Sequence, residues 1–284
     1  MALQMTLFEP EARPRPPAQM GRTSFVEREA KSILTPATGM MKSYDFMLNP
    51  YRGCQFGCSY CYAAWFSEPE EMARWGEWVE VKTNAVRLLR KERTLPGAKV
   101  YIGSATDPYQ PVEGKTQLTR SLLEAMVEMS PQPRIVIQTR SPLVVRDVDV
   151  LEKFDNVRVN MSVPTDDDEV RRAFEPGAPA IVRRLAALKM LHAAGIATAA
   201  CVMPMLPLHD PVEFARSLRE TRAGKVYTGY FHAGAKQYTT GTRPEALRVA
   251  KRYNWTKERY EEAAAMIKSE LNLDEQGQMA YAPL

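Results

Sequence analysis

A short segment, YRGCQFGCSYCY at positions 51–62, holds the residues best suited to chemistry. It contains three of the four cysteines of this 284-residue chain, Cys54, Cys58 and Cys61, in the spacing C-x-x-x-C-x-x-C. Thiolates are soft ligands that suit zinc or iron–sulfur clusters. This spacing lets one loop bind three irons of a four-iron cluster, and the fourth iron stays open to a substrate or cofactor. Gly53 and Gly57 allow the backbone to approach such a cluster closely.

Other roles for the cysteines remain open at this point. A structural zinc site takes four ligands, usually as two separated pairs. The chain has no second cysteine pair, and its three histidines, at 192, 209 and 232, have no paired spacing. A disulfide is disfavoured by the odd number of clustered thiols. Cys201 lies apart in the apolar segment AACVMPM (199–205) and is predicted to be a small core residue.

Alternating strand and helix patterns begin just before the cysteines. Strands are predicted at 46–53, 98–104, 133–139, 156–163, 196–206 and 225–231, and helices at 83–91, 115–128, 146–153, 179–195, 211–222 and 256–271. This alternation predicts an α/β fold with a parallel sheet and outer helices. The count fits a partial (β/α)6 barrel, and an open doubly wound sheet is the alternative. Such barrels place their chemistry at the carboxyl ends of the strands.

The two ends of the chain are expected to differ from the barrel. Residues 1–45 are predicted to form an extended N-terminal arm, because RPRPP at 13–17 favours extended backbone and no strand or helix period is sustained there. Residues 46–284 would form the barrel with a C-terminal helical extension. No apolar run reaches the ~18–20 residues that cross a membrane. No secretory pattern starts the chain, so we expect a cytoplasmic protein without membrane contact. Nothing in the pattern indicates an oligomer.

The net charge of +4 is unevenly distributed. Residues 216–259 hold eleven Lys and Arg against three Glu, so this stretch carries +8 and the rest of the chain −4. Six aromatic residues are interleaved with these charges: Tyr227, Tyr230, Phe231, Tyr238, Tyr253 and Trp255. Basic groups attract phosphates and aromatic faces stack on unpaired bases, so the stretch is a candidate nucleic-acid-binding segment. A solvated helical face with ordinary core aromatics is the alternative.

The cysteine segment resembles a known signature. CQFGCSYC followed by Tyr62 is similar to the C-x-x-x-C-x-x-C-aromatic motif of the radical S-adenosylmethionine superfamily. The longer run NPYRGCQFGCSYCYA resembles the branch that contains spore photoproduct lyase, as do GSATDPYQPVEG, QTRSPLVVRDVDVL and NMSVPT further along the chain. The resemblance extends over residues 33–230 and agrees with the strand count.

This resemblance implies a partial barrel that carries a [4Fe–4S] cluster and S-adenosylmethionine. Cys54, Cys58 and Cys61 would ligate the cluster. A 5′-deoxyadenosyl radical formed from the cofactor would abstract a hydrogen atom from the substrate. By the same resemblance, an electron donor such as a flavodoxin or ferredoxin would reduce the cluster.

The resemblance also implies residues that contact S-adenosylmethionine. Tyr62 would lie beside the adenine, with a core tyrosine as the alternative. Ser104 and Asp107 lie in the segment that would meet the methionine amino group, where oxygens accept from an ammonium. A plain turn built by Asp107 and Pro108 is the alternative there.

Three later residues complete this implied cofactor site. Arg140 would bind the methionine carboxylate with its two-pronged guanidinium. Ser162 matches a serine near the cofactor. Glu175 would reach the ribose, or would instead be a helix N-terminal acid favoured by the helix dipole.

One position departs from the lyase. There a cysteine just before the second-strand Thr/Ser-Asp stretch returns a hydrogen atom to the product radical, whereas this chain has Ser104 and Ala105 in IGSATDPY. A hydroxyl O–H bond is too strong to replace a thiol in that step. Tyr60, Tyr62 or Tyr109 would then donate the hydrogen atom, or the reaction ends differently.

The expected function is therefore lyase-like radical chemistry on a nucleic-acid base, either repair or modification. A base in a duplex would have to leave the stack to reach a barrel interior. One alternative keeps the radical chemistry and changes the substrate to a peptide, a protein side chain or a small metabolite. Another is a metal-binding module without turnover.

Overall fold

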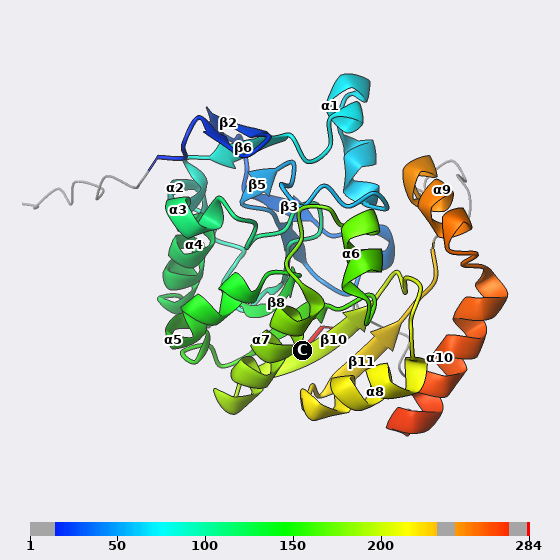
Figure 1. Cartoon of the computed structure of the whole chain (residues 1–284). Coiled ribbons are helices and arrows are strands. Elements are labelled where there is room, and N and C mark those ends of the chain that lie inside the picture. The colour runs from blue at the N-terminus through cyan, green and yellow to red at the C-terminus, as the bar shows by residue number, and fades with distance from the viewer. Residues whose placement is uncertain (1–14, 232–241, 273–282) are drawn as a thin grey trace, which may run out of the picture.

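The computed structural model describes residues 15–231, 242–272 and 283–284. Its centre is a seven-stranded sheet in the order β11-β10-β9-β8-β7-β4-β3 (Figure 1). Six of these strands are parallel and follow one another in chain order. They are β4 (Phe46–Leu48), β7 (Lys99–Ile102), β8 (Arg134–Thr139), β9 (Val157–Ser162), β10 (Ala197–Val202) and β11 (Lys225–Thr228). An antiparallel strand, β3 (Leu34–Pro36), pairs with β4 at the edge.

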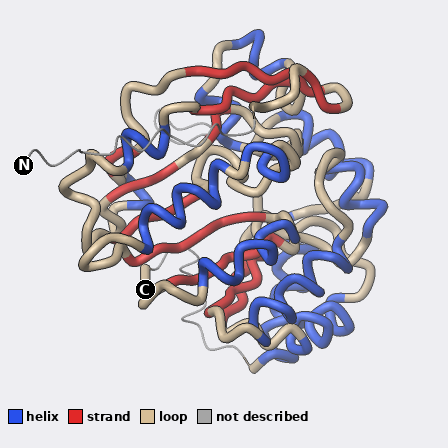
Figure 2. Tube along the Cα trace, turned by 90° about the vertical axis from the view of Figure 1, so that its left-hand side faces the viewer, coloured by secondary structure: helices blue, strands red, loops and turns tan. Residues whose placement is uncertain are grey.

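Helices join the strands and lie around the outside of the sheet (Figure 2). The α-helices of this part are α1 (Pro69–Ala73), α2 (Ala85–Leu89), α3 (Glu113–Thr116), α4 (Leu118–Val127), α5 (Val148–Leu151), α6 (Asp168–Phe174), α7 (Ile181–Ala193) and α8 (Pro211–Glu220). Short 3-10 helices are η1 (Gly39–Met41), η2 (Tyr62–Phe66) and η3 (Pro142–Asp147). The predicted α/β class with a parallel sheet is confirmed, and closure of this sheet into a partial (β/α)6 barrel stays a prediction.

Local sequence explains several features of these strands and helices. Every residue of β9 is buried, which is typical of a parallel strand covered on both faces. Helix α7 is followed by Gly195 at a φ of +75°, which suits a glycine C-cap. Asp210 caps the start of α8, because its carboxylate accepts from the backbone N–H groups of Val212 and Glu213.

The N-terminal region, predicted as an extended arm, pairs with other parts of the chain. Its described part is extended, but it pairs as β1 (Gln19–Met20), β2 (Thr23–Arg28) and the edge strand β3. Strand β2 runs parallel to β6 (Trp78–Lys82), and β5 (Tyr51–Arg52) pairs with the other edge of β6, giving a second sheet in the order β1-β2-β6-β5. No strand was predicted for β2, because its partner strand β6 lies about fifty residues further along the chain. Residues 1–14 lie outside the described residues.

Two helices follow the last strand. They are α9 (Pro244–Arg252), which was not predicted, and α10 (Lys257–Leu271), which was predicted. The division of the chain into an arm and a barrel domain stays a prediction. Helix α10 lies beside α8 (Figure 1), where Arg216 and Arg219 form ion pairs with Glu270. Within the described ranges, no helix combines the length and the apolar character needed to span a membrane.

Candidate active site

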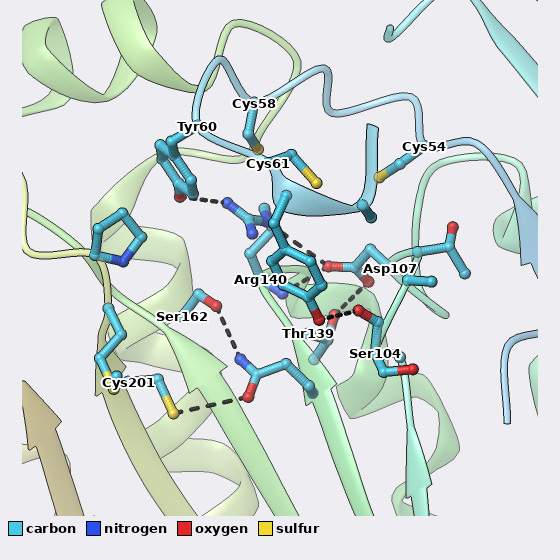
Figure 3. A pocket seen from close by; sticks show the side chains of 18 of the residues that line it. Cys54, Cys58, Tyr60, Cys61, Ser104, Asp107, Thr139, Arg140, Ser162 and Cys201 are labelled. Atoms are coloured by element: carbon cyan, nitrogen blue, oxygen red, sulfur yellow. Dashed lines mark hydrogen bonds and ion pairs between the residues drawn. The ribbon is translucent and has the colours of Figure 1, made fainter. Parts of the chain in front are cut away.

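A cavity opens where the parallel strands end and the cysteine segment crosses them (Figure 3). The structure brings nine of the predicted site residues together in its lining: Cys54, Cys58, Cys61, Tyr60, Tyr62, Ser104, Asp107, Arg140 and Ser162. They come from four separate parts of the chain, each placed by the end of a strand. Two predicted residues, Tyr109 and Glu175, do not line this cavity.

The cysteine loop has a backbone that only glycine accommodates at its start. Gly53 has a φ of +78°, and a Cβ on it would lie 2.5 Å from the carbonyl oxygen of Trp78. Gly57 has a φ of +58°. Both are in the left-handed region, which is costly for residues with a side chain. The two glycines therefore turn the loop so that its thiols face the cavity.

The loop is also anchored to the connection between α6 and α7. The backbone N–H of Ser59 donates to Phe174 at 2.8 Å, and that of Gly177 donates to Phe56 at 3.1 Å. A Cβ on Gly177 would lie 2.5 Å from the carbonyl oxygen of Gln55. Close backbone approach at Gly177 thus fixes the position of the cysteine loop.

Alanine at Gly177 is expected to destabilise the protein by about 1–3 kcal/mol, because the new methyl group collides with backbone that has no room to move. The measurement is urea unfolding of the cluster-free chain. Gly114→Ala is the matched control, since its Cβ would meet only Leu143 Cδ2 at 3.9 Å. Equal unfolding midpoints for the two variants would contradict this account of the anchor.

The three thiols lie in a desolvated environment. Burial raises the pKa of Cys54 to about 12. Burial also raises the pKa of Cys58 and Cys61, and the nearby Arg140 guanidinium opposes that rise. The thiols of the cluster-free loop therefore stay protonated at neutral pH. Because thiolate is the ligand form, metal binding must release these protons.

Arg140, directly after β8, is held firmly beside the cysteine loop. Its Nη1 donates to the hydroxyl of Tyr60 at 2.8 Å and to the Oε1 of Glu175. Its backbone N–H donates to Asp107 at 2.8 Å. The guanidinium is fixed from behind and presents its remaining donors to the cavity.

Glu175 is placed behind Arg140 and not in the cavity, so the expected contact with a ribose has no support in its position. Its side chain is fully buried, and its second carboxylate oxygen accepts from the buried Arg184. Burial alone would raise the pKa of Glu175, but Arg184 and Arg140 hold it below the ordinary value. Glu175 therefore acts on the site through Arg140.

Asp107 accepts three hydrogen bonds at the end of β7. The donors are Thr139 Oγ1 at 2.6 Å and the backbone N–H groups of Arg140 and Tyr109 at 2.8 and 2.9 Å. Burial outweighs these contacts and raises the pKa of Asp107. The carboxylate ties the ends of β7 and β8 together at the cavity wall.

Ser104 is joined to the cysteine segment through its backbone. Its carbonyl oxygen accepts from the Tyr62 hydroxyl, and its own hydroxyl accepts from Asn49 Nδ2 at 3.0 Å. The exposed Tyr62 ring is thereby held at the mouth of the cavity.

The part of the chain that carries these site residues matches a known family. Residues 48–219 match the sequence model of the radical SAM superfamily, a stretch that includes the whole cysteine segment. The chain belongs to the radical SAM superfamily. Among solved structures, spore photoproduct lyase complexed with dinucleoside spore photoproduct matches 89% of this chain and 80% of the lyase with a TM-score of 0.60. At 15% identity this likeness concerns the fold alone, and it confirms the superfamily fold that the sequence predicts.

Relatives by sequence are uncharacterised. A protein of Methanocaldococcus jannaschii is 30% identical over 211 residues, which cover 74% of this chain and 77% of the relative. A protein of Mycobacterium tuberculosis is 32% identical over 173 residues, which cover 58% of this chain and 50% of that relative. The chain thus spans only half the length of the mycobacterial relative.

The donor set fits the [4Fe–4S] cluster and the S-adenosylmethionine that radical SAM membership implies. Three thiols from one loop line one cavity, and the Arg140 guanidinium lies beside them. In the part of the chain that is described, no group of three or more His, Cys, Asp or Glu side chains is arranged for a single metal ion. A [4Fe–4S] cluster does not require its three thiols to converge on one ion, because each thiolate binds a separate iron.

The three candidate tyrosines occupy different positions in this radical SAM site. Tyr60 and Tyr62 line the cavity. Tyr109 is fully buried elsewhere, where burial and then the charges of Asp147 and Glu113 raise its pKa. The prediction that Tyr109 donates a hydrogen atom in the cavity is therefore not supported, because its side chain points into the core.

Several residues in the cavity wall were not predicted from the sequence. Tyr101, Gln138 and Met203 line it, and so does Cys201, which was predicted to be only a core residue. A glutamine inside the apolar strand PRIVIQT was an available signal for Gln138. For Cys201 the signal was its place near the end of a strand, two residues before Met203.

Proposed function

We propose that Cys54, Cys58 and Cys61 bind a [4Fe–4S] cluster, and that the cavity binds S-adenosylmethionine and a base of a nucleic acid. The observation that carries the proposal is the gathering of these three thiols and the fixed Arg140 around one cavity. When bound, the cluster and cofactor supply a 5′-deoxyadenosyl radical that abstracts a hydrogen atom. A flavodoxin- or ferredoxin-like protein would supply the electron.

The chain's own residues would bind and orient the cofactor. Arg140 would take the methionine carboxylate, since its guanidinium is a rigid fork of donors. Ser104 and Asp107 offer oxygens to the amino group, and Tyr62 offers a ring to the adenine. Ser162, whose hydroxyl accepts from Gln138 Nε2 at 2.9 Å, lies across the cavity.

The proposed nucleic-acid substrate is supported by the fold likeness to spore photoproduct lyase, whose solved complex holds a dinucleoside photoproduct. The position of α9 supports it as well. Thr242 lines the cavity, and α9 begins two residues later. Helix α9 exposes Arg248, Lys251 and Arg252 to solvent. A phosphate chain bound along these residues would lead a base toward the cavity mouth.

Not all of the basic, aromatic-rich stretch contributes to this surface. Tyr227, Phe231 and Trp255 are buried and have no face free to stack on a base. Tyr230 lines the cavity and remains the aromatic candidate. Lys236 and Tyr238 lie outside the described residues.

Replacing Arg248, Lys251 and Arg252 together by alanine is expected to weaken binding of single-stranded oligonucleotides. It should also reduce the slope of log affinity against log salt by about 2, because each phosphate contact contributes ~0.7. The measurement is a salt titration of binding to labelled DNA and RNA strands. Arg183→Ala, on the exposed face of α7, is the matched control and should leave the slope unchanged.

The proposed reaction is tested by isotope transfer. Oligonucleotides deuterated in the bases are incubated anaerobically with the reconstituted protein, S-adenosylmethionine and a reductant. Deuterium in the released 5′-deoxyadenosine is the expected result. Binding that is indifferent to salt, together with no deuterium transfer, would contradict a nucleic-acid substrate and favour a peptide or small metabolite.

A further inference from the structure

Cys201 was predicted to be a core residue, and this role does not explain why it lines a cavity. It lies near the end of β10 and lines the cavity that holds the three loop cysteines (Figure 3). Its Sγ lies 3.8 Å from Gln138 Oε1, as the dashed line in Figure 3 marks. Tyr101 donates to the same oxygen at 2.9 Å. The Gln138 amide also donates to Ser162 at 2.9 Å, so the acceptor that faces the thiol is fixed in orientation.

The chemical state of Cys201 suits transfer of a hydrogen atom. Burial raises its pKa to about 12, so the group stays a thiol and keeps its hydrogen at neutral pH. An S–H bond is weaker than the O–H bond of serine or the C–H bonds of a sugar. A thiol therefore gives its hydrogen atom readily to a carbon radical. The chain has four cysteines, so Cys201 is the one thiol that remains when three bind a cluster.

A second polar group lies buried beside Cys201. Tyr227 on β11 is the register partner of Cys201 and forms a small buried cluster with it and with Met203. Tyr227 is only 3% exposed, and its hydroxyl has no hydrogen-bond partner among the described residues. A buried hydroxyl without a partner is unfavourable. An acceptor from a ligand in the adjoining cavity would satisfy it.

We propose that Cys201 is the hydrogen-atom donor for carbon radicals formed in this cavity. The inference rests on the proposed function. In the step, the S–H bond breaks and a C–H bond forms, so the carbon radical becomes a closed-shell product and Cys201 becomes a thiyl radical. One electron from the reductant that also serves the cluster, with one proton from solvent, restores the thiol.

The test needs no knowledge of the substrate. Full-length protein, reconstituted anaerobically, is incubated in D₂O with S-adenosylmethionine and dithionite alone. The only carbon radical is then that of the cofactor, and the Cys201 thiol carries solvent deuterium. Mass spectrometry of the 5′-deoxyadenosine is expected to show deuterium with the wild-type protein and its loss with Cys201→Ala. Cys201→Ser serves as a second variant that keeps a polar group of similar size, and it should also lose the deuterium because its O–D bond is too strong.

Two further measurements make the result decisive. Iron content and S-adenosylmethionine binding of both variants should equal those of the wild-type protein, which separates loss of the donor from misfolding. Unchanged deuterium in Cys201→Ala would overturn the assignment. Absence of any 5′-deoxyadenosine from the wild-type protein would instead overturn the proposed function, and this inference with it.

Discussion

Alanine at any one of Cys54, Cys58 and Cys61 is expected to abolish stable binding of a [4Fe–4S] cluster. Each thiolate would hold a separate iron, so the loss of one leaves a second iron without a protein ligand. The remaining loop thiols have raised pKa values and give up their protons only to a bound metal. Iron and sulfide per chain, with the visible absorption after anaerobic reconstitution, measure the effect.

Cys201→Ala is the matched control for this set, because it removes the fourth cysteine of the chain, which is also buried, and leaves the loop intact. It should bind the wild-type amount of iron. The cluster assignment would be wrong if the loop variants kept full iron and sulfide, or if Cys201→Ala lost as much as they do.

Glu175→Gln is expected to lower the free energy of unfolding by about 3–5 kcal/mol, because it leaves buried arginines without their anion. Arg184 is fully buried on this carboxylate, and Arg140 shares it. The pKa of Glu175 is below its ordinary value. The contribution is therefore fully present above the ordinary glutamate pKa of ~4.3, and it is lost as the pH falls through the lower folded-state value.

Urea unfolding of the cluster-free chain at neutral pH measures this effect. Glu169→Gln is the matched control, since this exposed carboxylate on α6 should change stability by no more than about 0.5 kcal/mol. A loss below about 1 kcal/mol at Glu175 would mean that the two arginines find other partners, and that Glu175 does not position Arg140.

The sequence predicted those parts of the molecule that depend on local pattern. The six parallel strands and the long helices each follow from residues that are neighbours in the chain. Cys54, Cys58 and Cys61 were found because their spacing is itself the signal. Pairing of β2 with β6 was missed, because hydrogen bonding between distant strands leaves no mark on either segment alone.

For the site residues, the sequence pattern likewise did not predict the direction in which the side chains point. Period-two alternation says that Ala199 and Cys201 share a face of β10, but it does not say that this face ends at a cavity. Glu175 was predicted to contact a ribose or to be a helix N-terminal acid, but its contacts with Arg140 and Arg184 place it behind the cavity wall. The direction of a side chain depends on packing, which the sequence of one segment does not encode.

The most direct test of the account is the fate of S-adenosylmethionine on the anaerobically reconstituted protein under a strong reductant. The account predicts release of 5′-deoxyadenosine and methionine in equal amounts by the wild-type chain, and none by the chain with alanine at Cys58. A wild-type protein that holds its iron and leaves S-adenosylmethionine intact would contradict it, as would equal cleavage by the Cys58 variant.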